Sequence, residues 1–259
     1  MITLSSDFGT PYPAAMKGVI AARSDARLVD VAHDFPRQDV RAAAFWLREV
    51  LPYFPPATHL VVVDPGVGTG RRALVARAGD HLLVGPDNGV LAPVARRLAD
   101  GATAGDAARR LEWYAIDDTG AASSTFHGRD VFAPMAATVH DAGVGALESL
   151  AGLSALSDPV DLTLPEAAVE GGRAEGEVLV VDDFGNAITN VPGAFLEGRI
   201  AVLANGERVP AVETFAAVDP GERLATVGSH GYVELDVNRG RGDRAFGLDA
   251  GDRAVLESI

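Results

Sequence analysis

The stretch that most constrains the fold of this chain is VVVDPGVGTGRR, residues 61–72. Three valines lead into Asp64, and a proline and three glycines lie between that aspartate and two arginines. An apolar, β-branched run that ends in Pro and Gly is typical of a buried strand followed by a loop. Ligands of open α/β sheets bind outside the carboxyl ends of the strands. We therefore expect Asp64 to lie at a ligand-binding edge of a sheet.

Composition excludes several classes of protein. The 259 residues suffice for one large or two modest domains. A net charge of −14 argues against nucleic acid or anionic membrane as a partner, because both require a basic face. The lack of cysteine excludes disulfides and thiolate chemistry. The first residues, MITLSSDFG, do not resemble a signal peptide, and no apolar run approaches the length of a membrane span, so we expect a cytoplasmic protein.

The order of predicted elements divides the chain in two. Apolar strands alternate with amphipathic helices up to about residue 160, which predicts an α/β domain with a doubly wound, mostly parallel sheet. Beyond a segment rich in Pro, Asp and Gly, short β-rich runs predict a smaller antiparallel β domain, a barrel or a sandwich. We expect an N-terminal domain at 1–163, a linker at 164–173 and a C-terminal domain at 174–259.

Common site motifs are missing. GVGTGR does not satisfy G-x-G-x-x-G, and the chain has no P-loop, so neither dinucleotide nor P-loop nucleotide binding is supported. No H-E-x-x-H or G-x-S-x-G occurs, which argues against a zinc site and against a serine nucleophile of the α/β-hydrolase type. Asp117, which follows a predicted strand, is interpreted as a turn residue.

Three polar residues remain as a candidate catalytic group: Asp64, Arg71 and His127. Each lies in a loop at a predicted strand end or helix start, where polar side chains are seldom needed for packing. Each also has a structural explanation: a turn aspartate, a surface arginine, and a histidine that bonds a neighbouring carbonyl. The residue types leave both interpretations open.

A second group has the polarity of a nucleoside site: Asp7, Phe184, Asn186 and Ser229. A carboxylate can bind two ribose hydroxyls, an amide can pair with an adenine edge, and an aromatic ring can stack on the base. Turn, capping and core roles explain the same residues equally well.

Several motifs together resemble a known family. TLSSDFG, MKGVI, VDPGVGTGRR, VGPDNGVL, SSTFHGRDVFAP, DDFGNAITN and GSHGYVELDVN occur in this order along nearly the whole chain. The chain resembles the S-adenosylmethionine (SAM) hydrolases of the hydroxide adenosyltransferase type, which are related to the nucleophilic fluorinases and chlorinases. The resemblance implies an N-terminal α/β domain, a C-terminal β domain, and a homotrimer with active sites between one subunit's N-terminal domain and its neighbour's C-terminal domain.

The resemblance also assigns roles. Asp64, Arg71 and His127 match the family's water-activating triad. The remaining matches are substrate contacts: Asp7 on the ribose, Asn186 on the adenine, Phe184 and Phe215 on the ring, Ser229 near the methionine end, and Glu234 and Val237, partly through backbone. The halogenases carry Tyr in place of Asp64 and Phe-Tyr in place of Phe126-His127, so this triad is that of the hydrolases. The short loop after Asp7 matches the family's substrate-covering segment less well.

The implied reaction is attack of an activated water on the ribose C5′ of SAM, which yields adenosine and L-methionine. SAM is the substrate, and the resemblance implies neither a cofactor nor a metal. Three alternatives stay open at this point: a SAM-dependent halogenase, a sensor that binds SAM or adenosine without catalysis, and a metal-dependent phosphohydrolase that uses Asp and His.

Overall fold

The computed structural model describes residues 1–101, 111–120 and 122–259 of the chain. The chain divides into two compact units, Met1–Thr163 and Leu164–Ile259, and each is described by itself. In the described part of the chain, no helix is long and apolar enough to cross a membrane.

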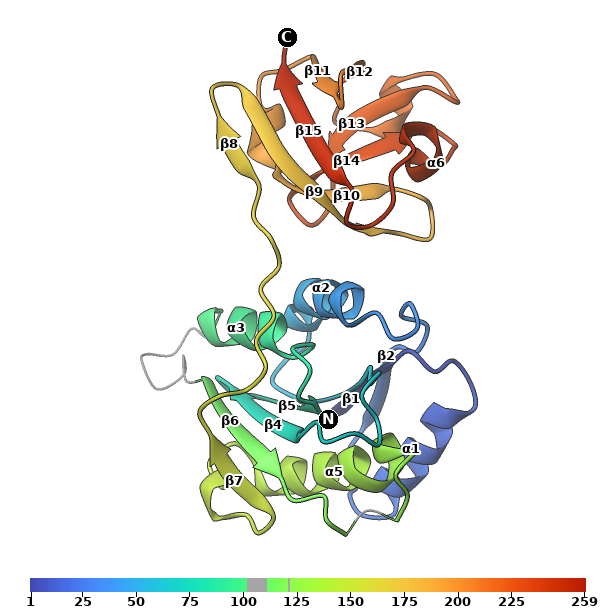
Figure 1. Cartoon of the computed structure of the whole chain (residues 1–259). Helices are drawn as coiled ribbons and strands as arrows, with labels where there is room; N and C mark the ends of the chain where they lie inside the picture. Colours follow the sequence, from blue (N-terminus) through green and yellow to red (C-terminus); the bar gives the residue numbers. More distant parts are fainter. Residues whose placement is uncertain (102–110, 121) are drawn as a thin grey trace. The chain divides into compact units, whose positions relative to one another are not determined.

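The first unit contains a seven-stranded sheet of order β2-β1-β3-β5-β4-β6-β7 (Figure 1). The strands from β2 to β5 in this order pair in parallel, whereas β4, β6 and β7 pair antiparallel with their neighbours. The elements are β1 (Ile2–Ser6), α1 (Tyr12–Ala21), β2 (Leu28–Ala32), α2 (Val40–Val50), η1 (Leu51–Tyr53), β3 (Thr58–Val62), β4 (Ala73–Ala78), β5 (His81–Pro86), α3 (Ala92–Asp100), β6 (Leu111–Ile116), η2 (Gly128–Phe132), α5 (Ala133–Ala142), η3 (Leu147–Ser149) and β7 (Leu153–Leu156).

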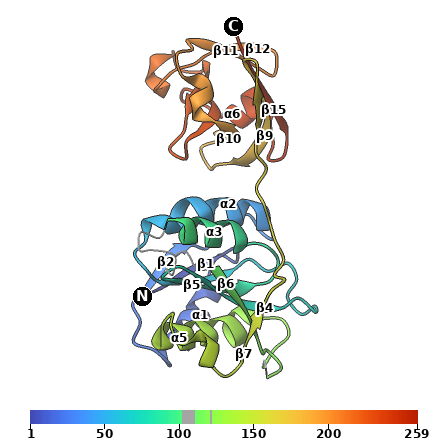
Figure 2. The ribbon, with the colours of Figure 1, turned by 90° about the vertical axis from the view of Figure 1, so that its left-hand side faces the viewer.

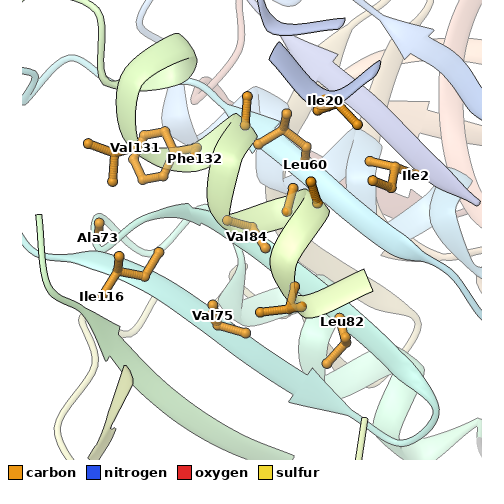
Figure 3. Packing of buried hydrophobic residues seen from close by; sticks show 14 of the residues in the cluster. Ile2, Ile20, Leu60, Ala73, Val75, Leu82, Val84, Ile116, Val131 and Phe132 are labelled. Carbon is orange, nitrogen blue, oxygen red and sulfur yellow. The ribbon is translucent and has the colours of Figure 1, made fainter. Parts of the chain in front are cut away.

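Helices cover both faces of this sheet: α1 and α5 lie on one face, and α2 and α3 on the other (Figure 2). Residues along and just after β3 alternate between the two cores. Leu60 and Val62 pack with α1 and α5, and Figure 3 shows Leu60 in this core. Val61 and Val63 pack with α2 and α3. Because both faces are buried, the strand reads as a continuous apolar run. The expected α/β class is confirmed.

Helix α2 forms where the apolar spacing predicts it. The Asp39 carboxylate accepts a hydrogen bond from the Ala42 N–H at 2.9 Å and so satisfies a donor of the first turn. Ala44 and Leu47 are completely buried, as is Leu51 just beyond the helix. Ala44, Leu47 and Leu51, spaced three and four residues apart, therefore lie on the face that packs on the sheet.

β4 and β5 are connected by Gly79 and Asp80 alone. Gly79 has a φ of +62°, which glycine adopts readily in tight turns. Two residues can join antiparallel strands, whereas a parallel crossover needs a dozen or more. The sequence predicts both strands, but the sheet is mixed where we expected mostly parallel pairing, because this hairpin turns the chain back on itself.

The second unit is an antiparallel barrel. Its strand order is β12-β11-β15-β9-β10-β14-β13, with β8 added beside β9. The Val212 N–H donates to the Ala225 carbonyl at 3.0 Å, so the chain after β12 meets β13 and nearly closes the sheet. The elements are β8 (Ala168–Glu170), β9 (Arg173–Val181), β10 (Ala187–Pro192), η4 (Gly193–Leu196), β11 (Ala201–Ala204), β12 (Glu207–Pro210), η5 (Phe215–Ala217), β13 (Arg223–Val227), β14 (Tyr232–Val237), α6 (Gly242–Phe246) and β15 (Arg253–Ser258).

β10 and β8 each have a feature that the sequence does not signal. β10 contains Thr189 and Asn190, which are polar but buried. The Thr189 hydroxyl donates to the Val233 carbonyl at 2.6 Å, and the Asn190 carbonyl oxygen accepts from the Glu177 N–H at 2.8 Å. These internal bonds allow polar residues inside a strand. β8 lies within the segment 164–173, which we expected to be a linker, and there it pairs with β9.

Candidate active site

Two aspartates follow neighbouring strands at one edge of the first sheet. Ser6 of β1 stands opposite Val62 of β3 in a parallel register, so Asp7 and Asp64 leave the sheet at the same end. Asp7 is 7% exposed, and its Oδ2 accepts a hydrogen bond from the Gln38 N–H at 2.7 Å. Because each carboxylate oxygen can accept more than one hydrogen bond, Asp7 retains acceptor capacity for a ligand.

Arg71 connects the three residues of the candidate catalytic group. Its Nε donates to Asp64 Oδ1 at 2.8 Å, while its Nη2 donates to Asp64 Oδ2 and, at 3.0 Å, to His127 Nδ1. The Arg71 and Asp64 side chains are only 9% and 4% exposed. The guanidinium carbon lies 5.0 Å from the centre of the Phe132 ring. A bidentate pair of this kind is both strong and geometrically restrictive. The structure thus brings Asp64, Arg71 and His127 into one hydrogen-bonded triad.

His127 is positioned by η2, a π-helical turn that runs into α5. Such turns are frequent at functional sites. A Cβ on Gly128 would lie 3.0 Å from Met16 Sδ and 3.3 Å from Val62 Cγ1. Glycine therefore allows η2 to pack directly against the end of β3, which places His127 beside Arg71. The helical segment begins at Gly128, directly after His127.

The hydrogen bond from Arg71 determines which ring nitrogen of His127 carries the proton and which one accepts a hydrogen bond. A guanidinium only donates, so Nδ1 of His127 is the acceptor, and the proton of the neutral ring is on Nε2. In this state Nε2 donates. It can hold the oxygen of a water molecule, but it cannot remove a proton from that water.

The loop of residues 64–71, the triad loop, carries Asp64 and Arg71, two of the three triad members. It lies against the segment before His127: Gly68 has a φ of +77°, and a Cβ on it would be 2.8 Å from the Ser124 carbonyl oxygen. Both the backbone conformation and the close approach require glycine. Gly68 therefore serves the packing of this loop against the segment before His127.

An aromatic cluster that the sequence did not single out lies next to His127. Phe126 makes edge contacts with Tyr12 and Phe8, with ring centres 5.5 and 6.1 Å apart. Tyr12, in the short segment after Asp7, is 55% exposed. The segment is short, yet it supplies an exposed ring beside the triad.

In the second unit, Asp182 holds Asn186. Both the backbone N–H and the side-chain amide of Asn186 donate to the Asp182 carboxylate, at 2.9 and 3.0 Å. The amide orientation is thereby fixed, with the Asn186 carbonyl oxygen left to accept from a ligand. Phe184 lies between them in sequence and is 79% exposed. The role of Asp182 is missing from the sequence prediction, although it begins the motif DDFGNAITN.

β14 places two carboxyl groups in a buried environment. Glu234 is 7% exposed, and burial, with the charge of Asp182, raises its pKa to about 7. Asp236 is fully buried, and neither of its oxygens has a hydrogen-bond partner among the described residues. Burial, reinforced by the charges of Glu234 and Asp182, raises the pKa of Asp236 to about 8. The sequence prediction named Glu234 but not Asp236.

The other predicted contacts of the second unit lie on different segments. Val237 ends β14, and Ser229 lies in the turn between β13 and β14. The neighbouring Gly228 makes room for Glu234, since a Cβ there would be 1.7 Å from Glu234 Oε1. Phe215 lies on η5, between β12 and β13, and is 39% exposed.

Other polar arrangements of the first unit do not form a second site. Ser6, His33 and Asp30 make a chain in which Ser6 Oγ is 2.7 Å from His33 Nδ1, and His33 Nε2 is 2.9 Å from Asp30. Ser6 is fully buried and cannot reach a substrate. Asp117 accepts two hydrogen bonds from Thr119, as expected of a turn residue. Within the described ranges, no group of three or more metal-binding side chains is found.

Comparison with known proteins places the chain in a family. The model of the SAM hydroxide adenosyltransferase N-terminal domain matches residues 2–150, and that of the C-terminal domain matches residues 176–255. The chain belongs to the SAM hydroxide adenosyltransferase family. The two matched regions fall within the two compact units of the structure.

Similar relatives in this family include two proteins named (R)-S-adenosyl-L-methionine hydrolase. One, from Salinispora tropica, is 43% identical, with 97% of this chain and 95% of the relative covered. The other, from Thermus thermophilus, is also 43% identical and covers 95% of each chain. A crystal structure of an uncharacterized conserved protein from Thermotoga maritima matches with a TM-score of 0.83 at 32% identity, over 99% of this chain and 100% of the other.

Proposed function

We propose that this chain hydrolyses SAM to adenosine and L-methionine. Family membership and the names of relatives that are 40–43% identical over nearly the whole chain support this activity. The observation that carries the proposal is the buried group in which Arg71 joins Asp64 to His127. A binding protein that only senses SAM has no need of such a group.

In the proposed reaction, the oxygen of a water molecule attacks C5′ of the ribose as the bond from C5′ to the sulfonium sulfur breaks. Both electrons of that bond pass to sulfur, so methionine leaves as a neutral thioether and needs no acid. The difficult part is the nucleophile, since bulk water has a pKa of about 15.7. A water held in line with C5′ removes several kcal/mol, in order of magnitude, from the barrier.

The hydrogen-bond directions within the triad suggest a separate chemical role for each of its three residues. His127 Nε2–H would hold the water oxygen, because Nδ1 is occupied by Arg71. Asp64 would accept the proton: its oxygens bind Arg71, but each keeps a second lone pair. Arg71, which stays cationic, would stabilise the developing hydroxide and orient both partners. The bond from Arg71 to His127 Nδ1 thus favours Asp64 over His127 as the proton acceptor.

The substrate contacts are proposed from the family resemblance. Asp7 would bind the ribose hydroxyls and Asn186 the adenine edge, and Phe184 and Phe215 are ring contacts. Ser229 would lie near the methionine end, with Glu234 and Val237 as further contacts. The fixed amide of Asn186 and the exposed ring of Phe184 suit these roles.

The assay that tests the function is incubation with SAM followed by chromatographic identification of the nucleoside. We expect adenosine, in amounts unchanged by EDTA or by added chloride or fluoride. A 5′-halo-5′-deoxyadenosine product would favour the halogenase alternative, and loss of activity with EDTA would favour a metal enzyme. Binding of SAM without adenosine release would identify a sensor.

We also propose a homotrimer with each site built from two subunits, as the family resemblance implies. The proposed contacts are divided between the two units of the chain: the triad and Asp7 in the first, the adenine and methionine contacts in the second. The cytoplasmic location expected from the sequence stays a prediction that fractionation of expressing cells would check.

Mixing inactive variants tests the shared site. His127→Ala and Asn186→Ala are expected to be inactive or weakly active alone, and to regain activity when co-refolded, because one type of interface then combines an intact triad with an intact adenine contact. Light scattering after chromatography should give three times the chain mass. Mixtures that stay as inactive as their components would contradict a site shared between subunits.

A further inference from the structure

The ends of the triad loop are bound by two adjacent residues that the reaction itself does not use. Asp87 and Asn88 follow β5 in the segment GPDNG, which reads from the sequence as a simple turn. Asn88 binds the residue before the loop and Asp87 the residue after it. Their positions therefore bear on whether Asp64 and Arg71 can meet.

Asn88 fixes the entrance of the loop. Its side-chain amide donates to the Val63 carbonyl at 2.9 Å, and its carbonyl oxygen accepts from the Val90 N–H at 3.1 Å. Val63 is fully buried and directly precedes Asp64. The backbone from which the Asp64 side chain projects is thus tied to the turn after β5.

Asp87 fixes the exit of the loop. Its Oδ2 accepts from Arg72 Nε at 2.6 Å, and its Oδ1 accepts from the Val160 N–H at 2.7 Å. The Asp87 side chain is 2% exposed, so little solvent competes for these bonds. An ion pair with this burial and additional hydrogen bonds orients both partners.

The same contact reaches Arg71 through one backbone carbonyl. The Arg72 carbonyl oxygen accepts from the Asp87 N–H at 2.9 Å and from Arg71 Nη1 at 3.1 Å. Arg71 therefore has Asp64 and His127 on one side of its guanidinium and a carbonyl held by Asp87 on the other. A displacement of that carbonyl would rotate the Arg71 guanidinium, which aligns Asp64 and His127.

We propose that Asp87 and Asn88 are positioning residues, which hold the two ends of the triad loop so that Arg71 keeps Asp64 and His127 in one hydrogen-bonded unit. They act through Arg71 and Asp64 and do not contact the substrate. The inference rests on the proposed hydrolysis of SAM for its kinetic test, but the contacts can also be tested without substrate.

The kinetic test uses Asp87→Asn and Asn88→Asp, which keep the shape of each side chain but remove one hydrogen bond. We expect kcat for adenosine release to fall 10- to 100-fold in each variant, with KM changed less than threefold, because alignment rather than binding is lost. Asp161→Asn is the matched control: its carboxylate pairs with Arg96 at 2.5 Å in the same unit and is 63% exposed. This control should stay within twofold of the unmodified protein.

A combined variant separates positioning from general destabilisation. In an Arg71→Lys background, Asp87→Asn should lower kcat by less than a further twofold, since Asp87 is proposed to act through the Arg71 guanidinium, which that background already lacks. A multiplicative loss, or a kcat that falls only in parallel with the melting temperature, would overturn the proposal.

A spectroscopic measurement keeps the inference independent of the reaction. With ¹⁵N-labelled arginine, the Arg71 Nε–H should give an NMR signal that is protected from exchange, and Asp87→Asn should accelerate its exchange at least tenfold. An unchanged signal together with unchanged kcat would overturn the proposal. If the unmodified protein releases no adenosine from SAM, the proposed function fails, and the exchange result alone decides the positioning role.

Discussion

Replacement of Arg71 by lysine is expected to lower kcat for SAM hydrolysis by a factor of about 10² to 10³. The guanidinium binds both oxygens of Asp64 and the Nδ1 of His127 at once. An ammonium group is a single point of charge and cannot reproduce this fork. Since Arg71 contacts the other triad members rather than the nucleoside contacts, KM should change less than threefold. Steady-state kinetics with separation of adenosine measures both constants.

Arg23→Lys is the matched control for this substitution. Arg23 is exposed, and its guanidinium donates to the Val19 carbonyl at 3.1 Å. It should retain full activity. Circular dichroism of Arg71→Lys should show a folded protein, so that a loss of rate reflects the triad. If Arg71→Lys kept kcat within threefold of the unmodified enzyme, the role of the triad proposed here would be wrong.

Asp236→Asn is expected to stabilise the protein, and more so at high pH. In the folded chain, burial raises the pKa of Asp236 to about 8, whereas the ordinary pKa of an aspartate is 3.8. Between about pH 4 and 8, the folded state therefore keeps a proton that the unfolded state releases, and the free energy of unfolding falls as pH rises. One pKa unit corresponds to roughly 1.4 kcal/mol, so the cost of this carboxyl near pH 8 is on the order of several kcal/mol.

Asparagine has the same shape as aspartate and no charge. The melting temperature of the Asp236→Asn variant should therefore exceed that of the unmodified protein by several degrees at pH 8.5. At pH 4, close to the ordinary aspartate pKa of 3.8, most of the gain should disappear, because the unfolded state then also holds the proton for part of the time. Differential scanning calorimetry across this range measures the effect. Asp219→Asn, an exposed aspartate of the same unit, should give no pH-dependent gain. A gain of equal size at pH 4 and pH 8.5 would show that packing, not protonation, is responsible.

The sequence allowed the triad to be grouped but not oriented. Asp64 and His127 could be placed at one sheet edge, because strand ends and helix starts leave clear signals in Val61–Asp64 and in the glycine after His127. The direction of each hydrogen bond depends on where Arg71 lies between them, and no local pattern encodes that. The bond from Arg71 to His127 Nδ1 therefore appears only in the structure.

The burial of Glu234 and Asp236 could not be predicted from the sequence, for a different reason. Glu234 and Asp236 alternate with apolar residues along β14, a pattern typical of a strand with one face in water. Both faces of β14 are in fact buried. Helix α6 and η4 pack against β14, and this cover cannot be predicted from the strand itself, so Asp236 could not be singled out. The antiparallel pairing of β4 and β5 could have been predicted from the sequence, since the two residues between them, Gly79 and Asp80, are too few for a parallel crossover.

The place of β15 in the barrel has a consequence for biosynthesis. This strand comes last in the order of the chain, yet it pairs with β11 on one side and β9 on the other, in the middle of the sheet. While a ribosome is still adding residues 253–258, β9 and β11 have no common neighbour and expose their backbone groups. The barrel therefore closes only after synthesis of this strand, whereas every strand of the first unit has been made about a hundred residues earlier.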